Sequence, residues 1–169
     1  MAINLAAATS LDQIADALHV TFVIVSQAAL KAGYLRDVVK GAVVLTLINL
    51  GQFASSETLE IRELAATELP LYLELALIVD DGEAATIALA IHQGVDLATD
   101  DRRARRLCAE RRLVEPARTV ALLRAYAETA QLPDGEIRKM LIRVRDRASF
   151  LPARSDPDMK WWNDHIRDA

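Results

Sequence analysis

The chain has a single cysteine, Cys108, among its 169 residues. One cysteine cannot form an internal disulfide, and no positively charged leader precedes a long apolar segment, so nothing predicts export. Long hydrophobic runs are missing too. The longest candidate, 42–50, is interrupted by Thr46 and Asn49, whereas a membrane-spanning helix needs about 20 apolar residues. We therefore expect a soluble, cytoplasmic protein with no membrane segment.

Internal repeats and low-complexity tracts are also lacking. Because 52% of the residues are hydrophobic and 26% are charged, the chain can bury one sizeable core, and a single domain is the simplest expectation. We expect this domain to cover 1–150, followed by an extended segment, 151–169, that packs on it. Trp161 and Trp162 would anchor that segment, with stacking on bases or clamping of a peptide as alternatives.

Negative charge is in slight excess, with a net charge of −4, which disfavours a simple cationic coat for nucleic acid. The excess is uneven, because arginines crowd the region directly after Asp100 and Asp101. Arginine can hold phosphate oxygens while carboxylates hold a cation, so this pattern suits an anionic substrate beside a metal. A solvated helix face explains the arginines equally well. The crowded positions are Arg102, Arg103, Arg105, Arg106, Arg111, Arg112 and Arg118.

Hydrophobic spacing predicts an alternation of helices and strands. That order is typical of an α/β fold, here a three-layer α/β/α sandwich with a mainly parallel central sheet. Helices are expected over 11–18, 26–34, 82–93, directly after Asp101, over 119–129 and from Asp134 onward, and strands over 20–25 and 95–99.

The helix 82–93 and the strand 95–99 have matching lengths, about 16 to 18 Å at ~1.5 Å and ~3.3 Å per residue. Because the tight turn at Gly94 makes them antiparallel, the start of the helix lies beside the end of the strand. Glu83 should then approach Asp100 and Asp101, and converging carboxylates select Mg²⁺ or Mn²⁺. An alternative of equal weight is that Asp81 and these aspartates only cap helices.

The segment from Asp80 to Leu113, DDGEAATIALAIHQGVDLATDDRRARRLCAERRL, resembles the central part of PIN domains, especially those related to bacterial toxin nucleases. The likeness rests on the GEA helix start, the alanine-rich helix, the glycine, and the TDD turn that leads into arginines. More weakly, NLAAATSLDQIADAL resembles the end of the first strand and the first helix, and FVIVSQAALKAGYLR the second strand and helix.

The resemblance implies a metal-dependent endoribonuclease with acids at four places around a sheet edge. Glu83 matches the third acidic position and Asp101 the fourth, with Thr99 as its hydroxyl companion and Asp100 as an extra ligand. The implied cofactor is Mg²⁺ or Mn²⁺ and the implied substrate is RNA. The residues expected to contact the substrate are Asn4, Arg102, Arg103 and Arg105.

This sequence departs from the family's pattern at two of the four acidic positions. The first acid belongs to a strand position before Asn4, which this sequence does not include, so the first strand is expected to be truncated; a start upstream of Met1 would restore the acid. Ala32 occupies the second position, and Asp37 is too far along the chain to replace it.

The resulting hypothesis is a toxin-type ribonuclease that a cognate antitoxin inhibits and that forms a homodimer. The alternative is a catalytically impaired PIN-like module that binds RNA or protein. A third option is an interaction subunit with no role on nucleic acid.

Overall fold

The computed structural model describes residues 1–29, 33–48, 58–113 and 115–167. The chain divides into two compact units, which are described separately. The first unit contains Met1–Val20, Gly33–Ile48 and Thr119–Ala169, and the second contains Thr21–Ala32 and Asn49–Arg118.

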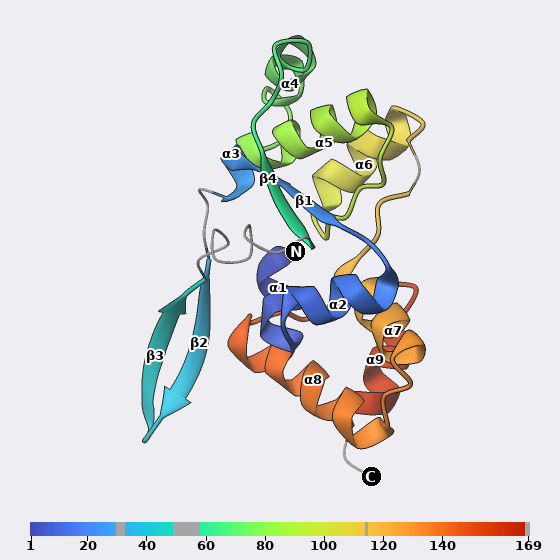
Figure 1. The fold of residues 1–169 in the computed structure, drawn as a ribbon. Coiled ribbons are helices and arrows are strands. Elements are labelled where there is room, and N and C mark those ends of the chain that lie inside the picture. The colour runs from blue at the N-terminus through green and yellow to red at the C-terminus, as the bar shows by residue number, and fades with distance from the viewer. Residues whose placement is uncertain (30–32, 49–57, 114, 168–169) are drawn as a thin grey trace. The chain divides into compact units, whose positions relative to one another are not determined.

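The second unit is built on two parallel strands, β1 (Phe22–Val25) and β4 (Leu59–Arg62). The helices around them are α3 (Ser26–Ala29), α4 (Leu69–Leu75), α5 (Asp81–Gln93) and α6 (Arg102–Glu110). As Figure 1 shows, α5 lies between α6 and the strand pair.

The helix α5 is the most buried helix of this unit, and its side chains belong to two apolar clusters. On one side, Ile87 packs with Leu75 of α4 and with Leu107 and Cys108 of α6. On the other side, Ala85 and Leu89 pack against Val25 of β1. The small side chains of α5 allow this close packing of neighbours on both of its sides.

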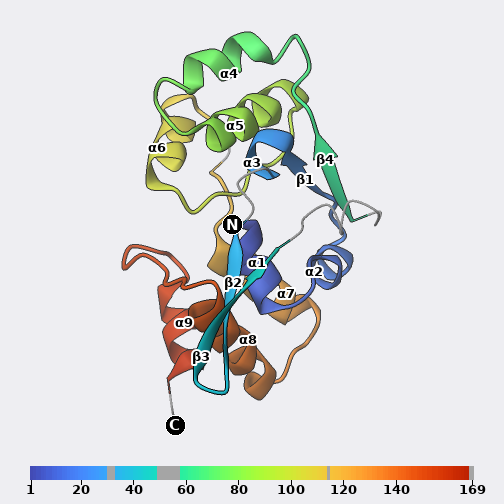
Figure 2. The same cartoon turned by 90° about the vertical axis from the view of Figure 1, so that its left-hand side faces the viewer.

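The first unit is mainly helical. Its elements are α1 (Ala2–Ala8), α2 (Leu11–Leu18), β2 (Tyr34–Val39), β3 (Ala42–Leu47), α7 (Thr119–Thr129), α8 (Asp134–Arg147) and α9 (Met159–Ile166). β2 and β3 form an antiparallel hairpin, and α1 and α8 contact each other and β2 (Figure 2). The largest fully buried side chains of this unit include Leu11, Ile14, Leu123, Met140 and Leu141.

Several predicted helices are confirmed. The helix 11–18 has the predicted bounds, and the Ser10 hydroxyl caps it by accepting the N–H of Gln13. Gly94 ends α5 with a left-handed backbone, φ 66° and ψ 33°, a conformation that glycine adopts without steric cost. The helices after Asp101, over 119–129 and from Asp134 are also present.

The α/β class is supported, but the three-layer sandwich is not confirmed, because the parallel sheet in the described residues has only two strands. The predicted strand 95–99 is wrong. Only an isolated bridge joins Ala98 to Ala117, and Val95 and Asp96 are exposed. A short apolar run becomes a strand only where a neighbouring strand pairs along its length.

Three other local predictions need correction. Residues 2–8 form a helix instead of a strand end, because alanine and leucine are the strongest helix formers. The helix predicted over 26–34 is described as α3 up to Ala29, and Tyr34 already begins β2; residues 30–32 lie outside the described part.

The segment 151–169, expected to be extended, contains the helix α9. Met159, Trp162 and Ile166 recur at helical spacing, and Trp162 is fully buried with its ring edge against Phe150, at a centroid distance of 5.9 Å. Trp161 instead contacts the His165 ring one turn later. The anchoring role expected for the tryptophan pair therefore falls to Trp162.

Among the helices that the structure describes, none has the length and apolar character needed to cross a membrane.

Candidate functional site

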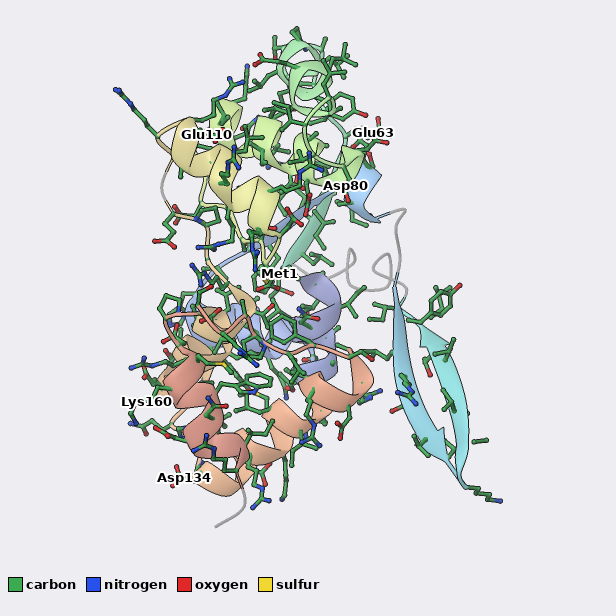
Figure 3. The ribbon with its side chains drawn as sticks, turned by 180° about the vertical axis from the view of Figure 1, so that it is seen from behind. Met1, Glu63, Asp80, Glu110, Asp134 and Lys160 are labelled. Carbon is green, nitrogen blue, oxygen red and sulfur yellow. The ribbon has the colours of Figure 1, made fainter. Side chains whose placement is uncertain are left out.

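The start of α5 is capped by Asp80, whose carboxylate accepts the backbone N–H of Glu83 at 3.0 Å. Asp81, considered as the cap from the sequence, is instead the first residue of the helix and is exposed. Gly82 is buried, and a side-chain carbon there would lie 3.2 Å from the Cα of Ala28 in α3. Figure 3 marks Asp80 at this end of α5. One side of the helix start is thus closed by α3, while Glu83 is half-buried.

The start of α6 is capped in the same way by Asp101. Its Oδ1 accepts the N–H of Ala104 at 2.8 Å, and its own N–H donates to the hydroxyl of Thr99 at 3.1 Å. The N–H of Thr99 donates in turn to the carbonyl of Ala117 at 2.9 Å. These bonds hold the residues 99–101, here called the acidic turn, at the positive end of the α6 dipole, which favours carboxylates.

No group of three or more histidine, cysteine, aspartate or glutamate side chains suited to a metal occurs in the part of the chain that the structure describes. A closed metal site made of protein ligands alone is therefore not assembled there. Mg²⁺, however, is commonly held by one or two carboxylates and completed by substrate phosphates and water. Asp101 fits that open type of site, since the cap occupies only Oδ1 of its carboxylate, and Asp100 precedes it directly in the sequence.

The arginines of α6 have different surroundings. Arg102 and Arg103 are exposed in the first turn. The side chain of Arg105 is only 13% exposed; its Nη1 donates to the carbonyl of Pro116 at 2.7 Å and, at a longer 3.5 Å, to that of Thr99. Arg106 is 81% exposed and pairs with Glu110.

Asn4, expected to contact substrate from the end of a strand, lies in α1 and belongs to the first unit. Its Nδ2 donates to the hydroxyl of Thr119 at 3.0 Å, in a buried bond between α1 and α7. Asp37 lies in β2, where Arg147 donates two hydrogen bonds to its carboxylate at 2.7 and 3.1 Å. Ala32, expected from the sequence at the family's second acidic position, lies outside the described residues.

A buried carboxylate, Glu68, was not anticipated from the sequence. It accepts hydrogen bonds from Gln93 Nε2 at 3.0 Å and from the N–H of Ala65 at 2.8 Å. These bonds, that of Gln93 first, hold the pKa of Glu68 below its ordinary value. Burial raises the pKa of the Cys108 thiol, which agrees with the expected role of this residue as a small apolar side chain.

The helices packed on a parallel strand pair place the second unit in the α/β class. A family model described as a PIN domain matches residues 35–154, which is 120 of the 169 residues. The chain therefore belongs to the PIN domain family. No curated protein and no solved structure gave a match.

Proposed function

We propose that this chain is a toxin-type PIN endoribonuclease that hydrolyses RNA phosphodiester bonds with Mg²⁺ or Mn²⁺. Membership of the PIN family supports the proposal. The observation that carries it is the acidic turn: Asp100 and Asp101 stand at the start of α6, directly before the exposed Arg102 and Arg103. Carboxylates for a cation and guanidiniums for phosphate are thus presented by one short segment.

In this proposal Asp101 is the principal ligand and Asp100 an extra one; Glu83, expected as a ligand from the sequence, does not form with them a group of three acids suited to a metal in the described structure. A bound divalent metal would lower the pKa of a water and offset charge on the phosphate. The Ala104 N–H fixes the carboxylate of Asp101 through Oδ1 and leaves Oδ2 for the cation. Because the Thr99 hydroxyl accepts the Asp101 N–H, its own proton can be donated to a neighbouring oxygen.

Arg102 and Arg103 would bind phosphate oxygens of the RNA, since their exposed side chains extend from the first turn of α6. The remaining expectations stay predictions: contact of Asn4 with substrate, an antitoxin that inhibits the chain, a homodimer, action in the cytoplasm, and a domain boundary near residue 150.

The second candidate function is a PIN-like module that binds RNA or protein without cleaving it. Two observations favour it. The described residues gather no three acids for a metal, and the family's second acidic position carries Ala32. A module of this kind would keep the exposed Arg102 and Arg103 of α6 as its binding surface.

Calorimetric titration with Mn²⁺, followed by an RNA cleavage assay with Mg²⁺, Mn²⁺ or EDTA, separates the two functions. The nuclease proposal predicts metal binding and cleavage that EDTA abolishes. Salt-dependent RNA binding without metal uptake or cleavage would favour the binding module. If neither RNA binding nor cleavage occurs, the nuclease proposal and the RNA-binding form of the module are both wrong.

A further inference from the structure

Arg105 differs from its neighbours in α6 because its guanidinium donates hydrogen bonds to backbone carbonyls outside the helix. Nη1 donates to the Pro116 carbonyl at 2.7 Å and lies 3.5 Å from the Thr99 carbonyl, and Nη2 donates to the Glu115 carboxylate. With 13% of its side chain exposed, Arg105 has little surface left for a substrate. The three acceptors belong to two separate segments, the acidic turn and residues 115–118.

These two segments are also joined through their backbones. The Thr99 N–H donates to the Ala117 carbonyl at 2.9 Å, and the Ala117 N–H donates to the Leu97 carbonyl at 2.8 Å. This pairing is an isolated bridge and not a continued strand. Without further strand pairing on either side, the backbone bonds alone give the acidic turn little lateral support.

Arg105 contacts the acidic turn through its backbone and the neighbouring segment through its side chain. Asp101 caps α6 through the Ala104 N–H, and the Arg105 N–H donates to the Asp101 carbonyl at 3.0 Å. The Arg105 side chain then returns to the segment that pairs with Thr99. Arg105, four residues after the cap, therefore ties the helix start to the acidic turn and to residues 115–116.

We propose that Arg105 is a positioning residue, which holds the acidic turn in place through the carbonyls of Pro116 and Thr99, and not a group that binds RNA. Its link to cleavage rests on the proposed function; the contacts themselves do not. A planar guanidinium can bridge several acceptors at fixed angles, whereas a lysine ammonium offers only a flexible point charge. Arg105→Lys therefore keeps the charge and removes the bridge.

The matched pair of variants is Arg105→Lys and Arg106→Lys. Arg106 is adjacent in sequence, is 81% exposed and bonds only to Glu110 among the described contacts. Hydrogen exchange of the full chain tests the bridge without any substrate. Arg105→Lys should speed exchange at the amides of Thr99, Asp101 and Ala117 by at least ~10-fold while the amides in the middle of α5 stay unchanged. Unchanged exchange in Arg105→Lys, or equal acceleration in Arg106→Lys, overturns the proposal.

Kinetics and RNA binding distinguish positioning from substrate contact. Arg105→Lys should lower kcat by ~10- to 100-fold with little change in KM, as expected for displaced catalytic groups. Arg105→Gln should leave the salt slope of RNA binding unchanged, whereas loss of a phosphate contact would reduce that slope by about 1. A raised KM with unchanged kcat, or a reduced slope, contradicts positioning. If the unmodified chain cleaves no RNA, the proposed function fails, and hydrogen exchange still decides the role of Arg105.

Discussion

The starts of α5 and α6 are capped alike, each by an aspartate that accepts a backbone N–H in the first turn. Their surroundings differ. The third residue after the Asp80 cap is the half-buried Glu83, and Gly82 lies against Ala28 of α3. The cap of α6 is preceded by a second aspartate and followed by exposed arginines. Because capping is common to both, capping alone cannot identify a functional acid; the extra carboxylate and the exposed arginines are the reason for proposing the start of α6 as the site.

The difference extends along both helices. α5 is held by buried contacts on its sides and, at its end, by the bond from Gln93 to the buried Glu68. α6 buries one face and carries exposed ion pairs on the other, such as Arg106 with Glu110. Such exposed pairs add little to stability, because water screens them. We infer that α5 is the framework helix and α6 the helix available to ligands.

The largest expected effect comes from Asp101→Asn. Asparagine caps a helix about as well as aspartate, so the free energy of unfolding should change little, while the loss of the anionic ligand should lower metal-dependent RNA cleavage by ~100-fold or more. Cleavage rates and denaturant unfolding measure the two effects. The matched variant is Asp80→Asn, at the other cap, which should cleave normally. Full activity of Asp101→Asn would mean that Asp101 is only a cap.

The next effect concerns the closed side of α5. In Gly82→Val the new side chain would crowd Ala28, whose Cα and Cβ lie 3.2 and 3.3 Å from the added carbon. Overpacking of this kind costs about 1–3 kcal/mol. Gly135→Val in the first turn of α8 is the control, since a carbon added there meets no atom within 4 Å apart from the adjoining backbone of its own helix, and it should stay within about 0.5 kcal/mol. Equal stability of the two variants would contradict the close packing of α3 on α5.

At the opposite end of α5, Glu68→Gln should destabilise the fold near neutral pH, because an amide cannot accept from both donors as a carboxylate does; one mispaired buried group costs about 1–2 kcal/mol. Hydrogen bonds from Gln93 and Ala65 lower the pKa of Glu68. Its contribution is thus fully present above the unfolded pKa, about 4.3, and disappears as the pH falls through the lower folded pKa.

Unfolding of both proteins at several pH values tests this linkage. The stability difference between the unmodified chain and Glu68→Gln should be constant above the unfolded pKa and should shrink below it. A difference that stays constant down to the acid unfolding limit would show that Glu68 does not titrate with a lowered pKa.

Elements governed by local signals could be predicted from the sequence. Ser10 marks the start of α2 and Gly94 the end of α5, because a capping hydroxyl and a left-handed glycine act on their own helix. Elements that need a distant partner could not. The segment 95–99 has the composition of a strand, but only Ala98 finds a partner, Ala117. In α1 the helix propensity of alanine outweighed the likeness to a strand end.

In the candidate site, too, residues that depend on local signals could be predicted and residues that depend on distant partners could not. The acids at the starts of α5 and α6 could be located by spacing, because each follows directly from a helix boundary. The part played by Arg105 could not, since Pro116 lies 11 residues further along and approaches only through the fold. Glu68 and Gln93 are 25 residues apart and likewise share no local signal.

The smallest expected effect is the change in stability when a capping aspartate is replaced. Asp80→Ala removes the acceptor for the Glu83 N–H and should destabilise the fold by about 1 kcal/mol, with cleavage unchanged, whereas Asp80→Asn should cost a few tenths at most. Asp101→Ala should show a similar loss of stability together with the loss of cleavage already expected for Asp101→Asn. Thermal unfolding and RNA cleavage of the four variants give the two readouts. If Asp80→Ala also abolished cleavage, the start of α5 would belong to the site as fully as that of α6, and the distinction between a framework helix and a ligand-facing helix would fail.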